Sequence, residues 1–147
     1  MGKLVRTIGL CSFAMLGWAV ASATAVADDG FVVLVNEHNT TSSMSRAELK
    51  RAATGTTKQW DSGAVVQLGI NPGDAPETQY LASLFETTPR ELLSRIEEQV
   101  FKGEMRRPAV LHSSGDCIAF ARAVAGAICV ASAQSHVPPE AHVVTIH

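Results

Sequence analysis

Hydrophobic residues along this chain fall into short, continuously apolar runs separated by stretches with helical spacing. The run at 31–36 is rich in β-branched side chains, and the run at 64–69 has the same character. Such runs are typical of strands buried on both faces. Two later runs, at 127–130 and 141–146, predict a third buried strand and a last strand at the edge of the sheet.

Polar residues predict where two of the helices begin. Ser45 with Glu48, and Thr88 with Glu91, have the spacing of a capping box. In this arrangement two side chains satisfy backbone N–H groups that a helix start leaves free. The first helix is expected to end at Gly55, because glycine readily takes the left-handed conformation that follows a helix.

Two further helices are expected, one beginning near Pro76 and one covering 113–124. The predicted order of elements is β-α-β-α-α-α-β-β. Alternation of buried strands with helices favours an α/β fold, with a mostly parallel sheet of about four strands and helices on its faces. We expect a single small domain over 28–147.

The first 27 residues have the three-part pattern of a cleavable secretory signal. Lys3 and Arg6 form a basic start, 8–21 is uncharged and mostly apolar, and 25–27 has the small-x-small pattern of a cleavage site. An apolar helix over 8–21 would be ~21 Å long, too short for a bilayer core of ~30 Å. We therefore expect cleavage after Ala27, no stable membrane anchor afterwards, and a periplasmic or secreted protein.

The charge balance disfavours a nucleic-acid partner. The chain has 12 basic and 14 acidic residues, and the predicted signal contains two of the bases and no acid. No basic run occurs, whereas phosphate neutralisation needs clustered Lys and Arg. Arg106 and Arg107 together offer contact with an anionic partner, although adjacent loop arginines are also ordinary on a solvated surface. Trp60 is either an exposed contact residue or part of the core rim.

Several short segments occur in a characteristic order along the mature chain. The pair at 35–36 ends the first strand, 45–49 opens a helix, and Gly55 and Trp60 follow at set distances. The segment 126–128 has the sequence Gly-Ala-Ile. In this order the chain resembles the phosphate-binding proteins of ABC uptake systems, in particular short exported relatives that contain only part of that fold. The resemblance implies part of a periplasmic binding protein.

The resemblance also implies a ligand site at the helix start that follows the second strand. The candidate ligand-binding residues are Asn71, Gly73, Asp74, Ala75, Glu77 and Thr78. Members of the family have a segment resembling Arg-x-x-Gly-Ser-Gly-Thr here, and this chain has two acids in its place. Helix N-termini attract anions, but a free phosphate would be repelled by both carboxylates, and Asp74 reads as an N-terminal cap. We therefore do not expect phosphate to bind.

Two functions follow from these observations. The first is an exported module like a solute-binding protein, with a small oxyanion or another small solute, or transport proteins of the envelope, as its partner. It predicts a concave, partly polar pocket near 71–77. The alternative is an envelope protein-interaction or structural module that has lost the ancestral ligand site. It predicts that side chains of the chain itself fill this corner and that an apolar patch lies elsewhere.

Two cysteines, Cys117 and Cys129, follow the predicted signal. Exported chains favour disulfides. From Cys117 the predicted helix rises ~12 Å and the following strand returns ~10 Å, so the two cysteines end nearly level. A disulfide is expected, with two buried thiols as the alternative.

Catalytic chemistry has little support in the sequence. The chain has none of the hydrolase, metalloprotease or phosphate-loop motifs that would indicate an enzyme. Its five histidines lack the spacing of metal ligands. We expect no enzyme activity, no cofactor and no metal site.

Overall fold

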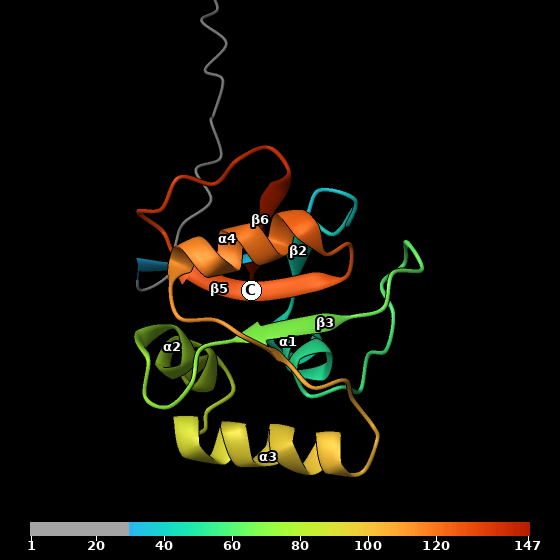
Figure 1. Cartoon of the computed structure of the whole chain (residues 1–147), viewed down its shortest axis with the longest axis vertical. Coiled ribbons are helices and arrows are strands. Elements are labelled where there is room, and N and C mark those ends of the chain that lie inside the picture. The colour runs from blue at the N-terminus through green and yellow to red at the C-terminus, as the bar shows by residue number, and fades with distance from the viewer. Residues whose placement is uncertain (1–29) are drawn as a thin grey trace, which may run out of the picture.

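A computed structural model describes residues 30–147, so the predicted signal at 1–27 lies outside the described residues (Figure 1). Six strands form one sheet in the order β2-β6-β1-β5-β3-β4. Strand β1 runs antiparallel to both β5 and β6, and the other three pairings are parallel. The mostly parallel sheet is therefore confirmed. The strands are β1 (Phe31–Asn36), β2 (Ser43–Met44), β3 (Gln67–Ile70), β4 (Ala109–Val110), β5 (Ala127–Ser132) and β6 (Ala141–Ile146).

The sheet differs from the prediction in three details. Strands β2 and β4 were not predicted, because two residues carry no recognisable pattern. Strand β6 lies inside the sheet and not at its edge, since β2 pairs with its outer side. Strand β3 begins at Gln67 and not at residue 64, because Val65 and Val66 pair with the preceding segment: Val65 forms an isolated bridge with Gln59, and Val66 N–H donates to the Lys58 carbonyl.

The four helices begin where the polar signals predicted. They are α1 (Arg46–Ala53), α2 (Pro76–Leu84), α3 (Pro89–Phe101) and α4 (Ser114–Ala123). Both capping boxes form: the Ser45 hydroxyl accepts from Glu48 N–H at 3.2 Å, and Thr88 does the same for Glu91. Gly55 follows α1 with a φ of +80°, the left-handed conformation expected there.

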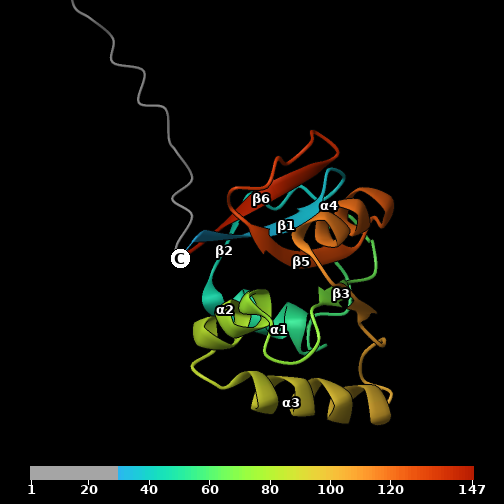
Figure 2. The same cartoon turned by 60° about the vertical axis from the view of Figure 1, so that its left-hand side comes forward.

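The helices cover both faces of the sheet. Helix α4 lies on one face, α1 and α2 lie on the other, and α3 packs beyond them, farthest from the strands (Figures 1 and 2). Alternate side chains of β1 point to opposite faces of the sheet. Val33 and Val35 belong to the core under α1, α2 and α3, whereas Leu34 belongs to the core under α4. Burial on both faces explains why β1 reads as a continuous apolar run.

A disulfide joins α4 to the sheet. The Sγ atoms of Cys117 in α4 and Cys129 in β5 are 2.03 Å apart, and the Cα atoms are 5.8 Å apart. Both cysteines are fully buried, which confirms the predicted bridge. Because it links residues 12 apart in sequence, it closes a short loop and is expected to contribute ~3 kcal/mol.

Candidate functional site

The candidate site lies where β3 leads into α2. The N-cap residue of α2 is Ala75, which makes no side-chain cap hydrogen bond. The interpretation of Asp74 as the N-cap is therefore wrong. Pro76 supplies the reason, because the residue before a proline is driven into the extended conformation that an N-cap requires. Ala75 accordingly has φ −57° and ψ 145°, and it has no side-chain acceptor to offer.

Two of the predicted ligand residues are used within the fold. The Thr78 hydroxyl donates to the backbone carbonyl of Asn71 at 2.6 Å. Both residues are buried, and only 1% of the Thr78 surface is exposed. This bond fixes the loop that follows β3 against the first turn of α2.

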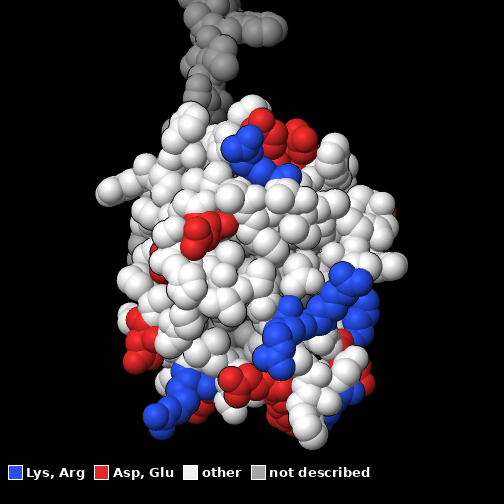
Figure 3. Space-filling model, viewed as in Figure 1, with Lys and Arg blue, Asp and Glu red and all other residues white. Residues whose placement is uncertain are grey.

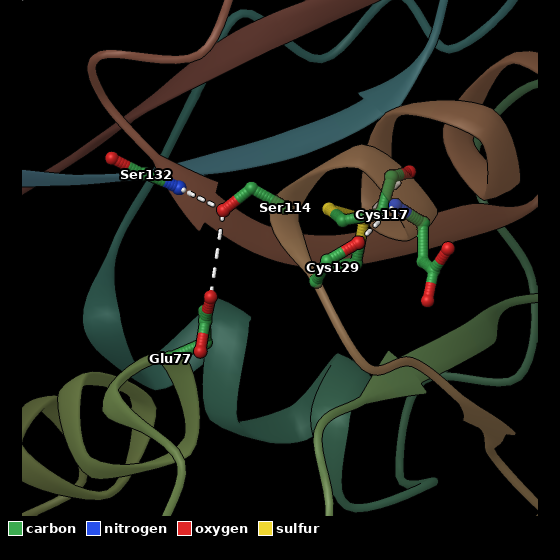
Figure 4. Close-up of a disulfide and its surroundings, with 7 residues drawn as sticks. Glu77, Ser114, Cys117, Cys129 and Ser132 are labelled. Carbon is green, nitrogen blue, oxygen red and sulfur yellow. Dashed lines mark hydrogen bonds between the residues drawn. A yellow bond between two sulfur atoms is a disulfide. The ribbon is translucent and has the colours of Figure 1, made fainter.

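A third predicted residue, Glu77, lies half-buried in the first turn of α2 and faces the start of α4 (Figure 4). The Ser114 hydroxyl donates a long hydrogen bond to Glu77 Oε1, 3.4 Å away. The same hydroxyl oxygen accepts from the Ser132 backbone N–H at 2.8 Å. We call these three residues the helix corner, because the starts of α2 and α4 meet the end of β5 there.

The remaining predicted residues lie on a different side of the α2 start. Gly73 and Asp74 line an open hollow of about 360 Å³ whose other wall is α3, with Arg90, Leu93, Ser94 and Glu97. Gly73 has a φ of +64°, which suits glycine at this tight turn. The structure thus separates the six predicted ligand residues and does not gather them around one cavity.

Ser114 and Ser132 are corner residues that sequence reasoning missed. Ser113 was identified as part of a helix start, and its hydroxyl does accept from Asp116 N–H at 3.1 Å. Ser114 directly follows that N-cap. This second hydroxyl at the same helix start was the one sequence feature that could have indicated a polar contact here. Its pairing with Ser132 depends on the packing of α4 against β5, which the sequence pattern does not specify.

Two other sequence candidates have structural roles. Trp60 is half-buried against the core, and its indole N–H donates to the Gly126 carbonyl at 3.0 Å, so it belongs to the core rim. Among residues 30–147, no cluster of three or more His, Cys, Asp or Glu side chains could hold a metal ion. In the same part of the chain, no helix is long and apolar enough to cross a membrane.

The sequence matches no protein-family model, and no curated protein sequence matches it either. Its structure, in contrast, matches solved structures. A phosphate ABC transporter substrate-binding protein from Clostridium perfringens, solved with bound phosphate, matches 80% of this chain with a TM-score of 0.60 and 13% identity. This chain has the fold of part of a phosphate-type substrate-binding protein. The resemblance inferred from the sequence is confirmed at the level of fold.

A second structure with the substrate-binding-protein fold agrees. An ABC-type phosphate transport receptor from Vibrio cholerae matches 80% of this chain with a TM-score of 0.52 and 13% identity. The chain spans 44% of the Clostridium protein and 46% of the Vibrio protein. The matched region is therefore less than half of either protein.

The electrostatics of the α2 start are unfavourable for a free oxyanion. An anion placed over this helix start would approach the carboxylates of Glu77 and Asp74. At about 4–5 Å, each carboxylate repels a unit negative charge by roughly 1 kcal/mol even with water-like screening. The hollow beside Asp74 contains one cation, Arg90, together with the acids Asp74 and Glu97, so its lining has no positive excess.

Proposed function

We propose that this chain is an exported protein-interaction module, built on part of the substrate-binding-protein fold, that does not bind free phosphate at its helix corner. It acts by binding and not by catalysis, in the periplasm or outside the cell, after cleavage following Ala27. The observation that carries the proposal is the position of Glu77, whose carboxylate lies between two helix starts and accepts a hydrogen bond from Ser114.

The Glu77 carboxylate supplies the negative charge that helix starts favour. The free N–H groups and positive dipole end of a helix are stabilised by a nearby anion. In this chain the anion is a side chain of α2 itself, so no ligand is needed at this point. The buried bond between Thr78 and Asn71 likewise leaves no free hydroxyl there. At the helix corner the chain's own groups thus take the place of a ligand, whereas the hollow beside Gly73 and Asp74 stays open.

The second requirement of the interaction-module hypothesis is an apolar patch elsewhere. Phe101, at the end of α3, is 94% exposed, and Val110, in the edge strand β4, is 62% exposed. Apolar patches mark contact surfaces more often than isolated apolar side chains do, and the Phe101 ring lies beside a hollow with partly apolar walls. Phe101 lies at the end of the outermost helix, away from the corner.

A second candidate is small-solute binding in a half-site that another chain completes. The bound phosphate in the Clostridium structure and the partial match, which covers 44% of that protein, favour it. Periplasmic binding proteins close two lobes around a ligand, and in this candidate the second wall of the site comes from another chain.

Calorimetric titration tests whether the chain by itself binds a free oxyanion. The full-length protein, exported and purified, is titrated with phosphate and with sulfate, beside the variant Glu77→Gln and the control Asp61→Asn in an exposed loop. We expect no saturable heat for the wild type or the control at millimolar anion. A weak signal confined to Glu77→Gln would agree with a blocking carboxylate, whereas saturable heat with the wild type would contradict the proposal.

A further inference from the structure

Three large hydrophobic side chains are exposed among residues 30–147, and the most exposed of them lies at the end of α3. Phe101 is 94% exposed, Val110 is 62% exposed and Val65 is 39% exposed. Val65 lines a shallow hollow with Arg106. Phe101 lines a neighbouring hollow with Arg107. We call the surface around the hollow beside Phe101, between the end of α3 and the loop to β4, the α3–β4 face and define it by Glu97, Phe101 and Arg107.

The hollow beside Phe101 is mostly apolar. It has a volume of about 400 Å³ and is lined by Ile96, Glu97, Val100, Phe101, Arg107 and Pro108. Because the Phe101 ring is almost fully exposed, it stands at the rim and does not fill the hollow. The face therefore has a protruding aromatic ring directly beside a recess with apolar walls.

The charges of this face are only partly compensated within the chain. Lys102 pairs with Glu98, and Lys58 pairs with Glu104 at 3.3 Å. Arg106, Arg107 and Glu97 form no ion pair with any described residue. Figure 3 shows Lys and Arg side chains gathered at the lower right, where the α3–β4 loop runs in Figure 1.

We propose that the α3–β4 face binds a second copy of this chain around a two-fold axis. The Phe101 ring of each copy enters the hollow of the other, and Arg107 of each copy meets Glu97 of the partner subunit. This inference rests on the proposed interaction function and names its surface and partner.

Self-complementarity favours a second copy over an unrelated acidic partner. In a two-fold contact, residue i meets residue j and residue j meets residue i, so a single patch must contain both halves of each interaction. The hollow beside Phe101 meets this requirement, with a ring and a recess, and with Arg107 and Glu97 on its border. A purely acidic partner would match Arg107 but would place like charge against Glu97. Buried aromatic anchors also supply much of the affinity in protein interfaces.

The contact is made by side chains and not by extension of the sheet. Strand β4 is an edge strand of only two residues, and the backbone N–H groups of the residues that flank it are engaged or absent. Leu111 N–H donates to the Ile70 carbonyl, and His112 N–H donates to the Asp116 carboxylate at 2.9 Å. Pro108 has no N–H. Edges blunted in this way resist pairing with another strand.

Charge reversal tests this geometry. Sedimentation velocity of the exported full-length protein, from micromolar to millimolar concentration, should show a reversible dimer. Glu97→Arg alone and Arg107→Glu alone should each weaken dimerisation at least tenfold, because each places like charges across the axis. A one-to-one mixture of these two variants should associate again, since every cross-pair is then opposite in sign.

Additional variants separate the interface from folding. Phe101→Ser should weaken dimerisation at least tenfold without changing the melting temperature of the monomer, because the ring packs on little in its own chain. Asp61→Arg, a reversal in an exposed loop elsewhere, should leave dimerisation unchanged. A wild type that stays monomeric at millimolar concentration, or single variants that lose association while their mixture does not regain it, would overturn the proposal. Either result would leave the calorimetric test of the helix corner unaffected.

Discussion

The helix corner and the α3–β4 face differ in whether their polar side chains are bonded within the chain. At the corner, Glu77, Ser114 and Ser132 bond to one another. At the face, Glu97 and Arg107 form no ion pair within the described residues, and Phe101 is 94% exposed. A region whose polar groups already bond to one another gains little free energy by binding a partner. A region whose charged groups lack partners and whose apolar side chains are exposed gains more. The fold resembles part of a phosphate receptor, yet the exposed ring and the charges without an ion pair lie at the end of α3 and in the loop that follows it.

The largest expected effect comes from removing the disulfide, which supports the corner and not the face. The double variant Cys117→Ala with Cys129→Ala should lower the free energy of unfolding by ~3 kcal/mol. Hydrogen exchange should rise most in α4, because the bridge holds that helix to β5. The double variant avoids a free thiol, and α3 serves as the internal control. Equal loss of protection in α3 and α4 would show that the two regions are not independent.

A smaller effect is expected from the buried bond below the corner. Thr78→Val keeps the shape of the side chain but leaves the buried Asn71 carbonyl without its partner at 2.6 Å. The unfolding free energy should fall by ~1–3 kcal/mol, measured by urea denaturation. Thr56→Val, at an exposed position, is the matched control and should change little. No difference between the two variants would mean that the bond does not fix the corner.

The smallest effect is expected from the cap of α3, on which the face is built. The Thr87 hydroxyl and the Thr88 backbone N–H bond to the Glu91 carboxylate and hold its pKa below its usual range. A lowered folded-state pKa stabilises the protein above the unfolded pKa, and this stability is lost as pH falls through the folded pKa. The stability difference between wild type and Glu91→Gln should therefore be present near neutral pH and shrink in acid. A difference that grows in acid would contradict this assignment.

Much of the fold could be predicted, because its signals are local. The capping boxes at Ser45 and Thr88 depend on residues three positions apart, and both form. The apolar run of β1 is continuous because its residues serve two cores. In contrast, β2 and β4 exist only through pairing with distant strands. The interior position of β6 depends on the same long-range pairing.

The candidate site was harder to predict than the fold. The six proposed ligand residues are neighbours in sequence, but they separate in space: Thr78 points into the core, Glu77 faces α4, and Asp74 faces α3. Which face each residue takes depends on the direction in which α2 leaves the loop. Pro76 sets that direction, because it makes Ala75 the N-cap. The acidic residues at 74 and 77 carry no signal of this constraint.

The most direct test of the account is a nuclear magnetic resonance titration of the full-length exported protein with phosphate. It follows the backbone amides at the starts of α2 and α4, residues 77–79 and 114–117. If Glu77 already occupies the corner, these signals should not move in a saturable way at millimolar phosphate. Saturable shifts confined to these two helix starts would contradict the account and restore the corner as a ligand site.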